Sequence, residues 1–303
     1  MSAEPNYGSA GFQIGAGIGR APLAALDAAA ALGRSPGSMH LQTAVLLQPN
    51  GAVQSPGLQV GGGLRPLYRE MSFNLAAMAA QAQAEDALVD PFLERHLAER
   101  LDDAMLAAAH RFAGDGAPRL HLDLSVAGVL SNAFSAVAGR VVSLGIELSL
   151  AEAGADPQGF ATACELVVAS GMILVLDRVP ATALLLCRPE RLGVDLMKVD
   201  WTAGLATPAN PALAEAIAEF GPDRIVLNRA DTEAALHWGR GHGIRRFQGR
   251  HVDAMLAASR ILVCPAAAVC TLPQCMERAA ATMAVARRGC GNPVLLDAGV
   301  VGP

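Results

Sequence analysis

Lysine is almost absent from this 303-residue sequence, in which Lys198 is the single lysine among 23 basic residues. Lysine is normally one of the commonest residues, so arginine has replaced it almost everywhere. Arginine is a wide planar fork, whereas lysine is a compact point charge. Lys198 stands in the apolar segment Val194–Asp200. It is therefore either a position where arginine cannot serve or a leftover lysine in a surface loop.

Aromatic residues and strong net charge are also scarce. Aromatic residues make up 4% of the chain, against 52% for apolar residues as a whole, and the formal net charge is −5. This charge gives no electrostatic reason to bind a nucleic acid polymer or an anionic membrane. The composition instead fits a helix-rich globular protein with a sizeable core.

The sequence lacks long apolar runs and a secretory start. No stretch reaches the roughly 18 unbroken apolar residues of a membrane-spanning helix. Met1–Asn6 shows no basic region followed by an apolar core. Cys164 and Cys187 stand singly in apolar runs, as small buried hydrophobes do. We expect a cytoplasmic protein without a membrane span.

Residues 1–38 are rich in Gly, Ala and Pro, which predicts a flexible or loosely docked N-terminal extension. Its Ile14–Gly19 segment does not match a dinucleotide-binding loop, because the glycine spacing is wrong and no strand precedes it. Beyond the extension, the apolar runs Leu41–Leu47 and Val53–Val60 flank Asn50-Gly51. This arrangement predicts a β-hairpin.

Helix-like and strand-like segments then alternate. We expect a long helical region from Arg69 to Phe112, whose later part repeats apolar residues at helical spacing, at Leu88, Phe92, Leu97, Leu101 and Met105. The strand-like runs that follow are Arg119–Leu124, Val141–Leu148, Met172–Leu176, Gly193–Val199, Arg224–Leu227 and Gly243–Phe247, and the helix-like stretches among them are Gln158–Ser170, Ala181–Cys187, Pro211–Phe220 and Thr232–Arg240. The alternation predicts parallel strands that are buried on both faces. With the opening pair of strands, we expect an α/β fold, a modified (β/α)8 TIM-type barrel over residues 39–262.

Polar residues stand at the ends of these strand-like runs, where the active-site mouth of such a barrel lies. They are Asp123, Ser125, Glu147, Asp177, Lys198, Asp200, Asn228 and Gln248. Each of them alone is typical of a helix cap or a loop. Their recurrence at the same end of successive strands predicts a site at the mouth.

The order of these motifs resembles the EAL domain, a bacterial family that hydrolyses cyclic di-GMP on a two-metal (β/α) barrel. The resemblance spans about residues 41–260 and rests on the segments Leu120–Ser125, Ile146–Leu150, Leu176–Pro180, Met197–Asp200, Val226–Thr232 and Phe247–Gly249. These stand where the family has, in order, Asn-x-Ser, Glu-x-Thr-Glu, Asp-Asp-Phe-Gly, Lys-Ile-Asp, Ala-Glu-Gly-Val-Glu-Thr and Gln-Gly. The resemblance implies a bacterial signalling protein with the same fold.

The resemblance also implies a role for each matching residue. In the family, acidic residues and an Asn hold two divalent ions that activate a water for attack on phosphorus. Asp123, Glu147 and Asp177 then correspond to magnesium ligands. Lys198 and Gln248 correspond to catalytic positions beside them, where the lysine helps to position the water.

Three departures argue against two-metal hydrolysis. Val53–Leu58, where the Glu-Ala-Leu signature is expected, has no carboxylate. The second Asp of the adjacent pair is Arg178, and the Glu of the sixth motif is Asn228, with Asp231 a turn later. A guanidinium in place of an anionic ligand weakens the attraction for a divalent cation. We expect a degenerate site without a resident cofactor, with Mg²⁺ bound only if activity remains, in which Arg178, Asn228 and Asp231 contact a ligand.

Two non-catalytic functions fit these features. The barrel either serves signalling or assembly by binding a protein partner, or it binds cyclic di-GMP without hydrolysis, since arginine pairs with phosphate in bidentate geometry. The alternative is an active phosphodiesterase that gives a linear dinucleotide. In the family, the loop after Asp177 takes part in metal binding and dimer packing, so a homodimer is a candidate assembly, although Val179-Pro180 alters that loop.

Residues 263–303 form a tail with four cysteines, Cys264, Cys270, Cys275 and Cys290. Four thiols can hold a zinc ion tetrahedrally, but these intervals are not the paired Cys-x-x-Cys spacing of zinc sites. The alternatives are a redox-sensitive pair, an intermolecular disulfide, or plain thiols. We expect a helix from Gln274 to Arg288, and the tail is a candidate partner-binding element.

Overall fold

The computed structural model describes residues 27–28, 30–31, 38–48, 52–55, 58–61, 63–82, 91–112, 119–138, 140, 144–186, 192–206 and 210–297. The predicted N-terminal extension and the Asn50-Gly51 turn lie almost wholly outside these residues, as does Cys187. None of the described helices combines the length and the apolar character that crossing a membrane requires.

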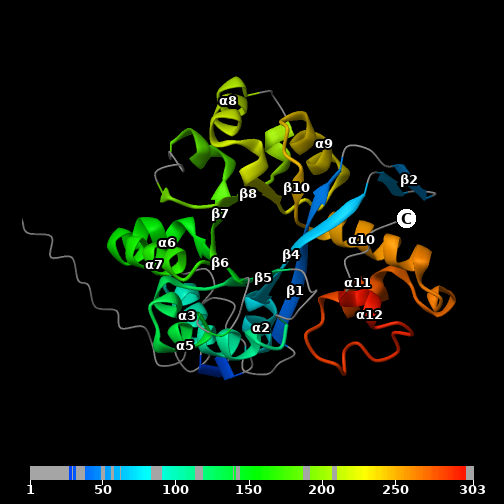
Figure 1. The fold of residues 1–303 in the computed structure, drawn as a ribbon, viewed down its shortest axis with the longest axis horizontal. Coiled ribbons are helices and arrows are strands. Elements are labelled where there is room, and N and C mark those ends of the chain that lie inside the picture. The colour runs from blue at the N-terminus through cyan, green and yellow to red at the C-terminus, as the bar shows by residue number, and fades with distance from the viewer. Residues whose placement is uncertain are drawn as a thin grey trace, which may run out of the picture.

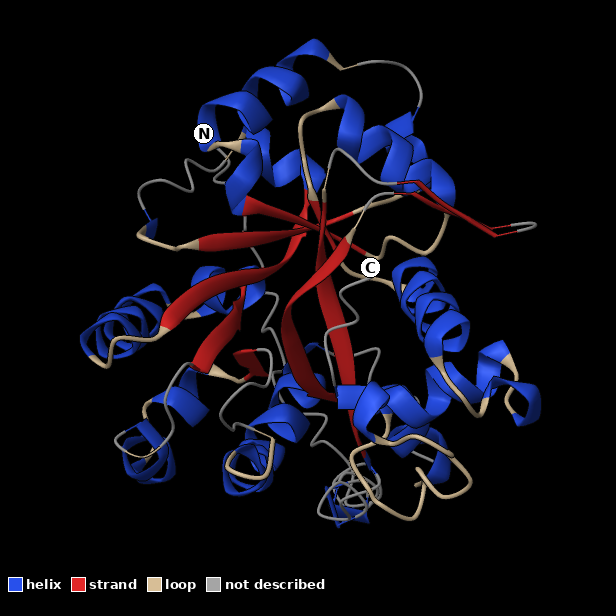
Figure 2. Ribbon diagram, turned by 45° about the vertical axis from the view of Figure 1, so that its right-hand side comes forward, coloured by secondary structure: helices blue, strands red, loops and turns tan. Residues whose placement is uncertain are grey.

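Eight strands close into a barrel with helices around it (Figures 1 and 2). The strands are β1 (Met39–Leu47), β4 (Leu64–Phe73), β5 (Arg119–Asp123), β6 (Leu144–Ser149), β7 (Ile173–Pro180), β8 (Leu196–Asp200), β9 (Ile225–Asn228) and β10 (Arg246–Phe247). Neighbouring strands from β4 to β10 pair in parallel, whereas β1 runs antiparallel to both β4 and β10. The predicted α/β barrel is confirmed, and the reversed β1 is its departure from eight parallel strands.

Helices follow most of the parallel strands and cover the outside of the barrel. They are α2 (Leu75–Gln81), α3 (Pro91–Ala109), α4 (Val126–Val129), α5 (Asn132–Ala138), α6 (Leu150–Ala155), α7 (Pro157–Ala169), α8 (Pro211–Phe220), α9 (Glu233–Gly241), α10 (Arg250–Val263), α11 (Leu272–Ala280) and α12 (Val294–Asp297). Local chemistry sets where they begin: the Asn210 side chain accepts from the backbone N–H of Leu213 at the start of α8, and Pro211 occupies the first turn.

The barrel interior is layered because side chains alternate along each strand. An apolar cluster inside it contains Ala44, Tyr68, Val175, Leu196 and Val226. Two residues further toward the mouth on the same strands stand Gln42, Glu70, Asp177, Lys198 and Asn228. The two-residue period therefore places a polar layer directly above an apolar one.

The predicted hairpin between Leu41–Leu47 and Val53–Val60 is wrong. The partner of β1 is β4, with Met39 opposite Phe73 and Leu47 opposite Leu64. Residues 52–61 instead pair with themselves as β2 (Ala52–Ser55) and β3 (Leu58–Gly61) in a separate two-stranded sheet. Pro56-Gly57, a turn signal as strong as Asn-Gly, divides that run.

Two predicted helices also have other bounds. The region from Arg69 to Phe112 begins as β4 and becomes helical at Leu75, since the first five of its residues complete a strand that is fixed by pairing with β1. The predicted Gln274–Arg288 helix starts earlier and stops earlier, as α11 over Leu272–Ala280. A capping box at Thr271 and Gln274 sets its start.

Close packing of α9 on the barrel gives a test of the fold. A Cβ on buried Gly239 would lie 2.6 Å from Phe247 Cε1, whereas a Cβ on Gly241 in the same helix would meet nothing within 4 Å. We expect Gly239→Ala to lower the free energy of unfolding by about 1–3 kcal/mol through overpacking. Gly241→Ala, the matched control, should be neutral or stabilising by up to about 1 kcal/mol. Chemical denaturation measures both, and equal effects would contradict this packing.

Candidate functional site

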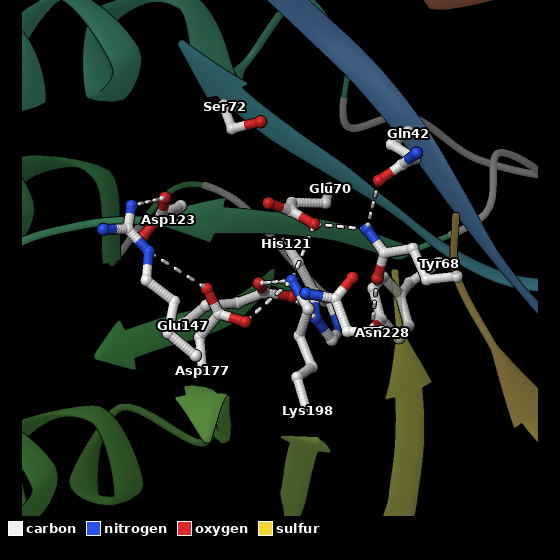
Figure 3. Close-up of polar contacts among 12 residues, drawn as sticks. Gln42, Tyr68, Glu70, Ser72, His121, Asp123, Glu147, Asp177, Lys198 and Asn228 are labelled. Atoms are coloured by element: carbon white, nitrogen blue, oxygen red, sulfur yellow. Dashed lines mark hydrogen bonds and ion pairs between the residues drawn. The ribbon is translucent and has the colours of Figure 1, made fainter. Parts of the chain in front are cut away.

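The polar layer of the barrel centres on Lys198, whose side chain is 1% exposed. Its Nζ donates to Glu147 Oε2 at 2.6 Å and to Glu70 Oε2 at 2.7 Å, and it lies 3.1 Å from Asp177 Oδ1 (Figure 3). These four residues come from β4, β6, β7 and β8. One ammonium therefore joins the carboxylates of three other strands.

Neutral polar side chains hold these carboxylates in place. Gln248 Nε2 donates to Glu70 Oε2, and Tyr68 donates its hydroxyl hydrogen to Gln248 Oε1 at 3.2 Å. His121 Nδ1 lies 2.9 Å from Glu147 Oε1, and its ring stacks on Tyr68 with centroids 3.6 Å apart. Burial, with Lys198 and Arg119 nearby, holds the pKa of His121 well below its usual value, so we assign a neutral imidazole that donates through Nδ1.

The charges of this cluster are strongly coupled. Burial alone would lower the pKa of Lys198, but the surrounding carboxylates raise it well above its usual value. Burial raises the pKa of Glu147 well above its ordinary range. Burial also acts to raise the pKa of Glu70, but Lys198 and the Gln248 hydrogen bond together outweigh it and lower that pKa. Since three carboxylates share one ammonium, Glu147 is the group on which a proton is most readily held.

Arg178 forms the outer edge of the site. Its Nη2 donates to Asp123 Oδ2 at 3.3 Å, and its Nε lies 3.7 Å from Asp177 Oδ2. The residue has a left-handed φ of 54° and lies where the register between β7 and β8 shifts. Such a conformation costs a non-glycine residue of order 1–2 kcal/mol, and strain of this kind collects at functional sites.

A pocket of about 360 Å³ opens beside Asp123 and Arg178. Its walls are mixed: Phe73 and Met105 are apolar, and the ionisable lining residues are Arg95, Asp102, Asp123, Glu152 and Arg178. This volume lies in the range of small-molecule sites. The mouth of the barrel therefore has a cavity next to a guanidinium.

Asp102 of α3 is a buried carboxyl in the wall of this pocket. It accepts from Ser125 Oγ at 2.5 Å and from the Ser125 backbone N–H. Burial raises the pKa of Asp102 to about 8, and the Ser125 hydrogen bonds oppose the shift only in part. Burial also raises the pKa of Asp123 to about 7, although Arg178 opposes it.

The other two predicted ligand-binding residues, Asn228 and Asp231, form their hydrogen bonds outside the Lys198 cluster. Asn228 Nδ2 donates to Asp200 Oδ1 at 2.9 Å. Asp231 Oδ1 accepts from the backbone N–H of Arg250, at the start of α10. Of the predicted ligand-binding set, Arg178 alone adjoins the pocket.

Glu70 is the site residue that sequence reasoning missed. The carboxylate of the Glu-Ala-Leu signature was expected at Val53–Leu58, but the next barrel strand after β1 is β4, which carries Glu70. Glu70 was not recognised as a site residue because Arg69–Phe112 was predicted to be helical. The usable signal was the mixed segment Leu67–Phe73, in which the two-residue period of a strand would place Glu70 on the same face as Tyr68.

The carboxylates of the polar layer are paired with cations of the same chain. In the part of the chain that the structure describes, no three His, Cys, Asp or Glu side chains form a group that could hold a metal ion. The Lys198 ammonium stands between Glu70, Glu147 and Asp177, and the Arg178 guanidinium between Asp123 and Asp177. The predicted magnesium ligands are therefore paired with the protein's own cations.

Comparisons with solved structures identify the fold. The chain aligns with Vibrio cholerae LapD S helix-GGDEF-EAL bound to c-di-GMP at a TM-score of 0.50 and 11% identity, covering 75% of this chain and 56% of that one. The apo form of LapD gives a TM-score of 0.50, 13% identity and the same coverage. The EAL domain of Mycobacterium smegmatis DcpA gives 0.48 and 17%, covering 71% of this chain and 90% of that one. No protein-family model and no curated protein matches the sequence.

The chain thus has the fold of EAL domains, a closed eight-stranded α/β barrel. It spans about half of the LapD chain, 56% of its length. At these identities the similarity establishes the fold, so the chemistry has to be argued from the residues of this site.

The Lys198 cluster predicts a large cost for removing its ammonium. Lys198→Met keeps most of the side-chain volume but leaves buried carboxylates unpaired, so we expect a loss of about 3–5 kcal/mol in unfolding free energy at pH 8. The loss should shrink at lower pH, because the carboxylates then take up protons. Arg245→Met, which removes an exposed pair with Asp223, is the control and should cost at most about 1 kcal/mol. Equal losses in chemical denaturation would contradict the buried cluster.

The raised pKa of Asp102 predicts a pH dependence of stability. Its folded-state pKa, about 8, lies above the usual value of 3.8, so the folded state binds the proton more tightly. Stability should rise as pH falls from about 8 towards 4, by at most about 1.4 kcal/mol per pH unit from this group. Asp102→Asn should remove the contribution of this group to the pH dependence of the unfolding free energy. Its exposed neighbour Asp103 supplies the control, and Asp103→Asn should keep the wild-type slope in denaturation curves.

Proposed function

We propose that this protein binds cyclic di-GMP at the mouth of its EAL-type barrel without hydrolysing it. The observation that carries the proposal is the position of Arg178, between Asp123 and Asp177 and beside a pocket of about 360 Å³. One of the structures that this fold resembles, LapD, is bound to c-di-GMP.

The chemistry of the ligand fits this rim. A cyclic dinucleotide has two phosphates, and a guanidinium pairs with phosphate through two parallel N–H donors. Arg178 is 47% exposed on its side chain, so it can face a ligand while it contacts the carboxylates. Arg95 lines the same pocket and adds a second positive charge. The apolar wall at Phe73 and Met105 suits a flat base.

The internal cations argue against hydrolysis. Two-metal catalysis needs ligands whose charge is available to divalent ions placed on both sides of the reacting phosphate. Here the Lys198 ammonium and the Arg178 guanidinium already pair with these carboxylates at distances from 2.6 to 3.7 Å and offset part of their charge. Binding a metal would require breaking these pairs in a buried setting, which is costly.

One observation favours a second candidate function, metal-dependent hydrolysis of cyclic di-GMP. Glu70 supplies a carboxylate that the sequence analysis counted as missing. With Asp123, Glu147 and Asp177 it makes four acidic oxygen donors, the ligand type that magnesium prefers. The two candidates differ in product, because hydrolysis gives a linear dinucleotide.

Calorimetric titration of the full chain with cyclic di-GMP tests the binding proposal. We expect binding to wild type, and Arg178→Gln to weaken it at least about tenfold, since a hydrogen bond to a charged group contributes roughly 1.5–3 kcal/mol. Arg140→Gln is the control, because Arg140 is exposed in the turn that precedes β6, at the other end of the barrel, and it should bind as wild type does. No heat at about 100 µM ligand would overturn the proposal.

A hydrolysis assay separates the two candidates. Wild-type protein incubated with cyclic di-GMP and Mg²⁺ or Mn²⁺ should leave the cyclic dinucleotide intact when products are resolved by chromatography. Metal-dependent appearance of the linear dinucleotide, abolished by Glu70→Gln, would establish the enzyme instead. Arg178→Asp adds a carboxylate at the rim, and a gain of hydrolysis in that variant alone would support the role of Arg178 in silencing the site.

A further inference from the structure

The C-terminal tail packs against the outside of the barrel as a small unit with α10. In Figure 1, α10, α11 and α12 lie together on one side of the molecule. Ala257 of α10, Cys275 of α11 and Leu296 of α12 form a small buried cluster. Six partly buried residues pack against these three, Cys270 and Cys290 among them, so thiols of the tail lie around one small core.

All four cysteines of the tail line one cavity beside this cluster. Cys264 caps the end of α10, Cys270 follows a short 3-10 turn, Cys275 lies in α11 and Cys290 lies in the turn before α12. The cavity has a volume of about 20 Å³. This is room for an ion or a water molecule before any side chain moves. Cys264 and Cys290, which are 26 residues apart in the sequence, therefore line the same small cavity.

Positive charge surrounds these thiols. Arg278 Nη1 donates to Cys270 Sγ at 3.3 Å, and Arg260 lines the same cavity. Thiolates are the form of cysteine that binds metals, and these guanidinium groups would be their counter-charges. All described cysteines are free, so no disulfide links these four.

We propose that Cys264, Cys270, Cys275 and Cys290 bind a metal centre through four thiolates. Thiolate ligands select zinc and iron–sulfur centres, and both share this chemistry. Among the described residues, no three His, Cys, Asp or Glu side chains form a metal-holding group, so metal binding would require the thiol side chains to rotate towards the cavity. Each thiol then releases its proton to solvent, and Arg260 and Arg278 offset the negative charge of the tetrathiolate centre.

Such a centre would fix the tail against the strands that carry the barrel site. Beyond α11, Thr282 Oγ1 donates to the Met39 carbonyl of β1 at 2.9 Å. Asp297 accepts from Arg69 of β4 at 2.9 Å and pairs with Arg287 at 2.8 Å. Arg69 is the neighbour of Glu70 in sequence. The metal centre would therefore brace β4 from outside the barrel.

The test begins with the wild-type full chain, purified under reducing conditions and reconstituted anaerobically with Zn²⁺ or with iron and sulfide. Metal content by mass spectrometry should reach about one zinc per chain, or iron with matching labile sulfide and visible absorbance. Either result supports the four-thiolate centre and identifies it. Less than about a tenth of an equivalent of metal under both conditions would overturn it. So would an intact mass that shows disulfides in the protein as isolated, before reduction.

Variants then assign the ligands. The Cys264→Ser/Cys290→Ser protein should lose metal at least about fivefold and melt at a lower temperature than the wild type. Cys164→Ser is the control, because Cys164 lies in α7 and is not among the residues that line the cavity, and it should keep both values. Equal metal content in the double variant and the control would refute the assignment, and this comparison needs only protein that stays soluble.

Discussion

The buried Lys198 ammonium is the interaction on which the barrel site depends. It lies within 3.1 Å of oxygens of Glu70, Glu147 and Asp177. Removing these carboxylates from water is costly, and only a charge of opposite sign at the same depth compensates for it. A planar guanidinium cannot place one charge at a point shared by three acidic groups. The compact ammonium of Lys198 therefore fits this position better than a guanidinium would. The alternative of a leftover lysine in a surface loop is excluded, because Lys198 is only 1% exposed.

The same alternation that builds the core also positions the site. Tyr68, Val175 and Leu196 close the interior, and two residues further on each strand stand Glu70, Asp177 and Lys198. The apolar layer blocks water from below, which strengthens the charge interactions above it. Because the two layers are only two residues apart along each strand, a change in the apolar layer would move the charged one.

Sequence reasoning was accurate where local signals decide the structure. The strand at Ile225–Asn228 and the helix at Pro211–Phe220 were predicted within one residue, since an unbroken apolar run and an Asn-Pro start define them. The strand β4 was not predicted, because its Leu67 and Met71 also fit helical spacing and its pairing with β1 is a long-range contact. Glu70 was lost with it. The sequence named the four cysteines as candidate zinc ligands, but their irregular spacing gave no sign that they line one cavity.

The rim of the site differs in kind from its interior. Lys198 is enclosed, and its pairs cannot be exchanged without exposing buried charge. Arg178 is half exposed and shares Asp123, whose pKa of about 7 lets it take up a proton near neutral pH. On the proposed function, a phosphate that draws Arg178 away from Asp123 would raise that pKa further, and the carboxyl would become neutral. The incoming anion would then compete with Asp177 alone for the guanidinium, so protonation of Asp123 would favour phosphate binding at this rim.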